Sequence, residues 1–279
     1  MGKYMTEEED FDLAIQYARK VEAEKPSAFL LDESTMKLAE PTTDENTLVL
    51  SATLIRQFLH KGTERDYCGV KIKAVYIDKT HKIPPTESML KGLYFESGCL
   101  GLSADESETI DLSRNKKTGK KSIDQERIDQ QILVFKSMCK DHDIVIQSEG
   151  TPERPRNVQV VIFKEINING RKVILRGVVD ILSRVKIEIR KGEWREYPFA
   201  IIDTKLTKDR NSTFGEYCWG QPENMDHVQL YEYSYILGYP ALYLVFDYNN
   251  AETMGYKFVP VNFDEMKKQE LMESIRKGV

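Results

Sequence analysis

Long apolar segments and paired cysteines are both missing from this sequence of 279 residues. No run approaches the roughly 20 apolar residues that a membrane-spanning helix needs. The N-terminal stretch is acidic over residues 7–10 and carries no apolar signal region, so we do not expect export. The four cysteines form no C-x-x-C pair and are widely separated: Cys68, Cys99, Cys139 and Cys218. Such cysteines are typical of free thiols in a reducing compartment, so we expect a cytoplasmic protein without a structural zinc site.

An overall excess of positive charge is also missing, because the formal net charge is −5. This balance argues against a protein coated in positive charge for nonspecific nucleic-acid binding, but it allows a local basic track. One track places five cations within eight residues: Arg114, Lys116, Lys117, Lys120 and Lys121. It is not a phosphate-binding P-loop, since Arg114 stands where that motif requires its first glycine. The track is either a solvated loop or a flexible arm that grips phosphates.

The predicted elements begin with helices, continue with a series of strands and finish with a helix–strand–strand–helix segment. Apolar residues recur at helical spacing over 6–24, 48–59, 87–95, 123–140, 226–237 and 263–276. Strand patterns cover 158–163, 172–183, 185–189, 199–205, 241–247 and 256–261, with shorter candidates at 70–76 and 143–147. Asn169-Gly170 predicts a tight hairpin turn between two of the strands. We expect an α/β fold with a central mixed β-sheet flanked by helices, in which residues 1–85 form an N-terminal helical elaboration and connector and residues 86–279 form the core.

The most informative stretch is Phe199-Ala-Ile-Ile-Asp-Thr-Lys205, in which an apolar run leads directly into Asp203. Such a run is typical of a buried strand, and side chains two residues apart on a strand point to the same face. Asp203 and Lys205 should therefore emerge together at the strand end, although alone they are equally typical of a surface ion pair. A second apolar strand, residues 173–180, also ends in a carboxylate, that of Asp180. The 22 intervening residues are enough for a hairpin that makes the two strands neighbours.

Two carboxylates brought together repel each other unless a cation lies between them, and hard oxygen ligands favour Mg²⁺ or Mn²⁺. Asp180 and Asp203 are therefore candidate metal ligands, with the backbone carbonyl of Thr204 as a third oxygen. Lys205 would lie beside the metal and either orient an attacking water or stabilise a pentavalent phosphorus, as phosphodiester hydrolysis requires. Gly177 would let another backbone or a substrate approach closely next to Asp180.

Two helical segments supply further candidates. Glu96 lies four residues after Gly92 on the same helical face, and it is either an ordinary surface glutamate or a further carboxylate that contacts the metal directly or through water. Gln229 and Tyr233 are also four residues apart, which makes them neighbours on one helical face. They are either an ordinary helix flank, or a pair in which Gln229 supports the lysine or a substrate phosphate and Tyr233 fixes position.

Together these segments resemble the PD-(D/E)XK nuclease superfamily, and within it the RecB-like and phage lambda-exonuclease-type branch. The matching residues, in this order over residues 86–247, are Gly92-x-x-x-Glu96, Gly177-Val-Val-Asp180, Asp203-Thr-Lys205 and Gln229-Leu-Tyr-Glu-Tyr233. The resemblance implies a restriction-endonuclease-like core and Mg²⁺- or Mn²⁺-dependent cleavage of DNA. It implies catalytic roles for Lys205, Glu96, Gln229 and Tyr233, and metal binding by Asp180, Asp203, the Thr204 carbonyl and Glu96.

Three departures within the superfamily narrow this expectation. RecB-type relatives usually carry histidine where this chain has Glu96, whereas glutamate is closer to the phage recombination exonucleases. Relatives with an iron–sulfur cluster use one early and three late cysteines, but no cysteine follows Cys218, so we expect no cluster. No helicase or Walker motif accompanies the site, so we do not expect the multi-domain RecB enzyme itself. The resemblance therefore favours a phage or mobile-element exonuclease that acts on double-stranded DNA ends in recombination or repair, within a bacterial or phage-infected cell. Some phage relatives form ring-shaped homo-oligomers or work with a single-strand annealing partner.

Other functions fit the same residues. An endonuclease would use the same site, because selection of DNA ends depends on how the site is walled or closed by oligomerisation, and RNA cleavage is open too. A catalytically inert DNA-binding module would keep the fold, although such members generally lose the lysine or a metal aspartate. Besides the basic track, we expect substrate contacts from the polar loop 207–221, through Lys208, Arg210 and Trp219. Trp219 either stacks on a base or packs in the core.

Overall fold

The computed structural model of this chain describes residues 31–32, 37–38, 47–59, 74–75, 80, 83–102, 121–150, 156–215, 217–249 and 255–279. The predicted helix 6–24 and all of the predicted strand 70–76 except residues 74–75 lie outside these ranges. Within them, no helix is long and apolar enough to cross a membrane. A short antiparallel pair, β1 (Leu31–Asp32) and β2 (Lys37–Leu38), precedes the main sheet.

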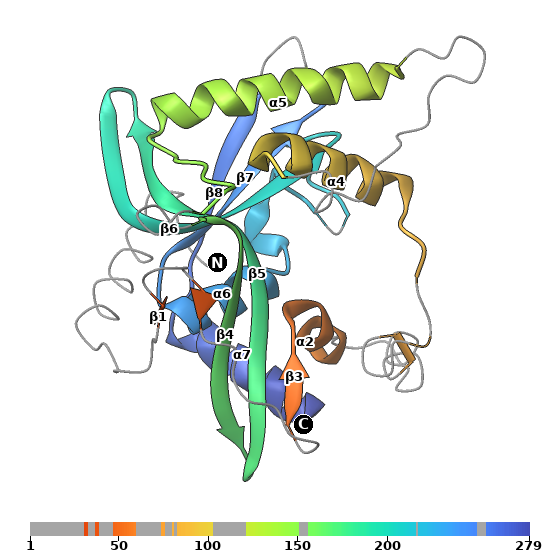
Figure 1. The fold of residues 1–279 in the computed structure, drawn as a ribbon, viewed down its shortest axis with the longest axis vertical. Helices are drawn as coiled ribbons and strands as arrows, with labels where there is room; N and C mark the ends of the chain where they lie inside the picture. Colours follow the sequence, from red (N-terminus) through yellow and green to blue (C-terminus); the bar gives the residue numbers. More distant parts are fainter. Residues whose placement is uncertain are drawn as a thin grey trace, which may run out of the picture.

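A mixed six-stranded sheet forms the centre of the described part (Figure 1). Its strands are β3 (Leu48–Leu50), β4 (Val158–Ile168), β5 (Arg171–Arg190), β6 (Glu193–Thr207), β7 (Ala241–Asp247) and β8 (Tyr256–Val261). The order is β3-β5-β6-β7-β8, with β4 also paired to β5; β3–β5 and β6–β7 are parallel, and the other pairs are antiparallel. The long strand β5 pairs with β3 near its start and with β6 only from Ile181 onward.

Helices cover both faces of this sheet (Figure 1). One hydrophobic cluster joins the sheet to α2 (Ala52–Leu59), α6 (Val228–Leu237) and α7 (Glu265–Gly278). A second cluster joins the opposite face to α4 (Glu87–Leu100) and α5 (Ile123–Asp141). Every residue of β7 is buried, as expected for a strand with helices on both sides. The predicted mixed sheet flanked by helices is thereby confirmed.

Local sequence signals determine where several of these elements begin and end. The hydroxyls of Thr86 and Ser122 accept hydrogen bonds from backbone N–H groups in the first turns of α4 and α5. Asn169 and Gly170 both have positive φ, 53° and 84°, as the tight turn between β4 and β5 requires. Gly238 ends α6 in the left-handed conformation with φ 73°.

Three predicted elements differ from the structure. Residues 48–50 are the strand β3 rather than the start of a helix, and β3 with α2 joins the same sheet and core, so the sheet draws on both sides of residue 85. Residues 185–189 continue β5 across a bulge after Ser183 instead of forming a new strand. Residues 143–147 are not a strand, because side chains hold this segment: Val145 N–H donates to Ser183 Oγ and Gln147 N–H to Asn157 Oδ1.

Candidate active site

The two motif aspartates meet where β5 and β6 separate. Ile181 of β5 pairs with Ile202 of β6, and Asp180 and Asp203 each lie one residue beyond this last pair of the ladder. Past this point β5 turns toward β3, while β6 continues beside β7 as far as Thr207. We call this point of separation between β5 and β6 the fork. It places the carboxylates of Asp180 and Asp203, from strands of opposite direction, next to each other. Both side chains are buried.

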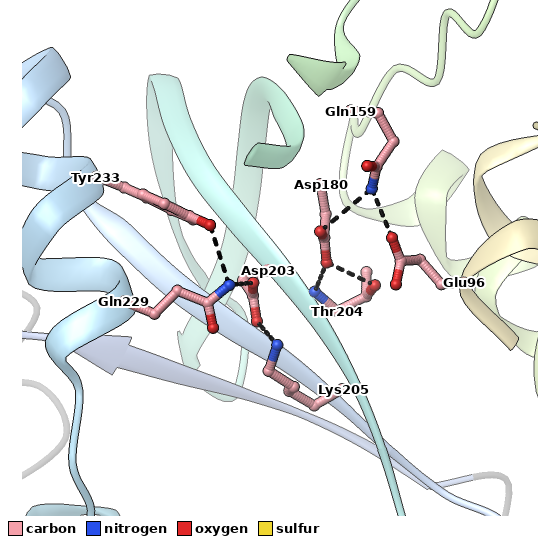
Figure 2. A network of polar contacts seen from close by, with 8 residues as sticks. All are labelled: Glu96, Gln159, Asp180, Asp203, Thr204, Lys205, Gln229 and Tyr233. Atoms are coloured by element: carbon pink, nitrogen blue, oxygen red, sulfur yellow. Dashed lines mark hydrogen bonds and ion pairs between the residues drawn. The ribbon is translucent and has the colours of Figure 1, made fainter. Parts of the chain in front are cut away.

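Thr204 closes this fork by binding Asp180. Its backbone N–H and its hydroxyl both donate to Asp180 Oδ2, over 2.8 and 3.0 Å (Figure 2). The sequence suggested a role only for the carbonyl of Thr204, and the donors on the same residue are what hold Asp180 in place. A β-branched hydroxyl residue between Asp203 and Lys205 was the signal that could have indicated this contact.

Asp203 is held by a lysine and a glutamine. Lys205 Nζ forms an ion pair with Asp203 Oδ2, so the two side chains do share one face of β6 as their spacing predicted. On the other side, Gln229 Nε2 donates to Asp203 Oδ1 over 2.9 Å and to the Tyr233 hydroxyl over 3.1 Å. Gln229 thus orients the aspartate rather than the lysine, and Tyr233 in turn positions Gln229 (Figure 2).

Glu96 lies on α4 and is linked to Asp180 by Gln159, a residue that the sequence did not single out. Gln159 of β4 donates from Nε2 to Glu96 Oε1 over 2.5 Å and, in a longer contact of 3.4 Å, to Asp180 Oδ1. Figure 2 shows its amide between the two carboxylates. Its one sequence signal is a lone polar residue within the apolar run Val158-Gln-Val-Val-Ile162.

The backbone at Gln159 is unusual for a strand. Its φ is +49°, in the left-handed region that glutamine rarely adopts. The hydrophobic side chains of the β4–β5 ribbon change face here: Val160 and its partner Val179 belong to one core cluster, whereas Val158 and its partner Ile181 belong to the other. Gln159 and Asp180 lie at this crossover, which turns both side chains toward the site.

Burial and mutual repulsion dominate the electrostatics of the carboxylates. Burial is the main reason why the pKa values of Asp180, Glu96 and Asp203 are raised above their ordinary range, most strongly at Asp180. The neighbouring charges of Asp203 and Glu96 raise the pKa of Asp180 further. Burial alone would lower the pKa of Lys205, but the charges of Asp203 and Asp180 outweigh it and raise that pKa, so Lys205 is a cation at neutral pH.

The donor chemistry of this cluster fits a divalent cation. Asp180, Asp203 and Glu96 supply hard carboxylate oxygens, and their mutual destabilisation is relieved by any positive charge between them. As the side chains stand, no three acidic, histidine or cysteine groups of the described residues converge on one point. Gln159 lies between Glu96 and Asp180, and Lys205 engages Asp203 Oδ2, which has no hydrogen-bond donor besides that ion pair among the described atoms.

Gly177 supports the site by making room for an aromatic ring. A Cβ added at this position would lie 2.4 Å from Cε1 and 2.7 Å from Cδ1 of Tyr233. The sequence assigned the space beside Gly177 to another backbone or a substrate, whereas the tyrosine that positions Gln229 occupies it.

We expect Gly177→Ala to push Tyr233 out of place, to lower the free energy of unfolding by about 1–3 kcal/mol and to loosen the Gln229–Asp203 contact. Urea unfolding monitored by circular dichroism measures the loss. Gly92→Ala is the matched control, because a Cβ there meets no atom within 4 Å and alanine favours a helix by about 0.5–1 kcal/mol. Equal stability of Gly177→Ala and wild type would contradict this account.

A groove opens directly onto the cluster from the α4 side. It has a volume of about 550 Å³ and its walls include Met89, Leu93 and Glu96 of α4 and Lys205 and Lys208 of β6 and the loop that follows it. Met89 and Leu93 are 54% and 46% exposed, so the outer part of the groove is apolar.

The structure describes four of the predicted substrate-contacting residues: Lys121, Lys208, Arg210 and Trp219. Lys208 lines the groove, but Arg210 turns away from it and donates from Nη1 to the carbonyl of Tyr256. Trp219 is only 2% exposed, and Tyr217, which is 44% exposed, stacks on it at 5.8 Å, so the accessible aromatic face belongs to Tyr217. Lys121 forms an ion pair with Asp129 at 2.5 Å. The remaining lysines of the basic track, Lys116, Lys117 and Lys120, lie outside the described residues.

Comparisons with known proteins add little to this geometry. No family model matches the chain, and no curated protein matches it. A solved structure named "Crystal structure of SSO0001" is similar over 95% of this chain and 84% of that chain, with 13% identity and a TM-score of 0.33. A likeness of this degree carries no argument about fold family or function.

Proposed function

We propose that this chain is a Mg²⁺- or Mn²⁺-dependent deoxyribonuclease of the PD-(D/E)XK superfamily, most similar to the lambda-exonuclease-type branch. Its substrate would be linear double-stranded DNA with a free end, in phage or mobile-element recombination or repair. The observation that carries the proposal is the strand fork that brings the buried Asp180 and Asp203 together with the half-buried Lys205, opposite Glu96. Residues 84 positions apart in the sequence, from Glu96 to Asp180, thereby share one site.

The side chains of the fork have complementary roles in such a reaction. Asp180, Asp203 and Glu96 would hold the cation, with the Thr204 carbonyl as a backbone ligand. When bound, a divalent cation supplies a Lewis acid that activates water and neutralises charge on the phosphate. Lys205, held as a cation beside Asp203, would stabilise the charge that develops on the phosphoryl oxygens or orient the attacking water. Gln229 and Tyr233 keep Asp203 from rotating away.

The groove along α4 is the natural path for the substrate strand. Its mixed walls offer Lys205 and Lys208 to phosphates and Met89, Leu93 and Tyr217 to bases. A space of about 550 Å³ is of the size that holds a small ligand. It can therefore accommodate a group of nucleotide size beside Lys205 and Lys208.

The test is digestion of end-labelled linear duplex and of covalently closed circular DNA, with Mg²⁺, Mn²⁺ or EDTA. We expect metal-dependent loss of the linear substrate alone, abolished by Asp203→Asn. Nicking or linearisation of the circle would make the chain an endonuclease, and loss of RNA instead of DNA would change the substrate. DNA binding without cleavage, unaffected by EDTA, would identify an inert nuclease-fold module.

A further inference from the structure

Gln159 occupies the space between Glu96 and Asp180, and we infer that its amide is a placeholder for the divalent cation, released when the cation binds. This inference rests on the proposed function, because it assumes that the carboxylates of the fork bind metal. It assigns a role to Gln159, which lies outside the nuclease motifs, and it predicts that replacing Gln159 strengthens metal binding.

The amide nitrogen and a bridging cation need the same space. Gln159 Nε2 lies 2.5 Å from Glu96 Oε1 and 3.4 Å from Asp180 Oδ1, where it donates to both oxygens. Magnesium binds carboxylate oxygens at about 2.0–2.1 Å. A cation held by both oxygens would have to lie between them, where Nε2 lies now. The amide must withdraw before Glu96 and Asp180 can act as ligands of one ion.

The backbone shows that this placement is imposed rather than incidental. Gln159 keeps φ +49° inside a strand, a strained conformation that persists only when its surroundings enforce it. The same residue is where the β4–β5 ribbon changes the face that it buries, so the left-handed turn aims the amide at Asp180. Strain of this kind is found at switch regions and ligand clamps.

The electrostatics of the site explain why the Gln159 amide lies between Glu96 and Asp180 when no metal is bound. The buried carboxylate of Asp180 and the half-buried carboxylate of Glu96 lie on either side of the Gln159 amide, whose donor hydrogens offer partial positive charge to both. Because the cation would have to break both contacts, part of its binding free energy is spent on displacing the amide. Removing the amide should therefore strengthen metal binding, whereas removing a true ligand would weaken it.

The experiment is isothermal titration calorimetry of the full chain with MnCl₂ in the absence of DNA. The variants are Gln159→Asn, whose shorter amide cannot span both carboxylates, and Gln159→Gly, which removes the amide. Asparagine and glycine both tolerate positive φ, so either change keeps the backbone. Gln130→Ala, an exposed glutamine of α5, is the control.

We expect both Gln159 variants to bind Mn²⁺ about tenfold more tightly than wild type, or about 1.4 kcal/mol, and to show a larger Mn²⁺-induced rise of the unfolding temperature. Gln130→Ala should match wild type. Unchanged affinity in both Gln159 variants would overturn the inference, and weaker binding would make Gln159 a ligand instead of a placeholder. A folded wild type that binds no Mn²⁺ would overturn the proposed function and this inference with it.

Discussion

Lys205→Ala is expected to lower the rate of DNA cleavage strongly and also to destabilise the fold. Lys205 is the one cation among the described residues that pairs with Asp203, whose side chain is only 1% exposed. Breaking a buried ion pair from one side costs about 3–5 kcal/mol, because it leaves a charge without compensation. Losing a preorganised charge at the reacting phosphate lowers the rate by about a hundredfold to a thousandfold. A single substitution would therefore lower both the stability of the fold and the rate of cleavage.

A double-mutant cycle separates these effects. Asp203→Asn combined with Lys205→Ala should recover most of the lost stability, since no uncompensated carboxylate remains, but it should recover no cleavage. Urea unfolding and an end-labelled digestion assay on the same samples give the two readouts. Lys191→Ala, an exposed lysine in the turn between β5 and β6, controls for general loss of positive charge. Cleavage by the double variant at wild-type rate would exclude this site.

Asp180→Asn has the opposite expected effect on stability. In the metal-free protein this buried carboxylate repels Asp203 and Glu96, whereas asparagine can still accept both hydrogen bonds from Thr204. We expect the metal-free variant to be more stable than wild type at pH 7, yet inactive and without stabilisation by Mn²⁺. Calorimetric unfolding in EDTA and in Mn²⁺ checks both statements. Asp247→Asn should bring no gain, because Asp247 accepts backbone N–H bonds from Arg210 and Asn249.

The difference between Asp180→Asn and wild type should depend on pH. The pKa of Asp180 is raised in the folded protein, so the protonated form favours folding. This stability is fully present below the unfolded pKa of about 3.9 and is lost as pH rises through the higher folded value. The advantage of the variant should therefore shrink as pH is lowered from 7 toward 4. An advantage that is constant over this range would show that repulsion at Asp180 is not its origin.

Sequence alone determined the parts of the site that depend on local periodicity. The two-residue spacing of Asp203 and Lys205 on a strand is enough to place both side chains on one face, and the four-residue spacing of Gln229 and Tyr233 does the same on a helix. Thr86, Ser122 and Asn169-Gly170 act within a few residues of themselves, so the helix starts and the hairpin could also be predicted.

Tertiary structure decided the contacts that join separate elements. The fork that brings Asp180 to Asp203 depends on where β5 leaves β6, and nothing in either strand alone specifies that register. Gln159 becomes part of the site only because β4 pairs with β5 and bends there. Tyr217 rather than Trp219 stays accessible because the indole fits into the core beneath it. Local pattern specifies which face a side chain takes, whereas only packing between distant segments specifies what that face meets.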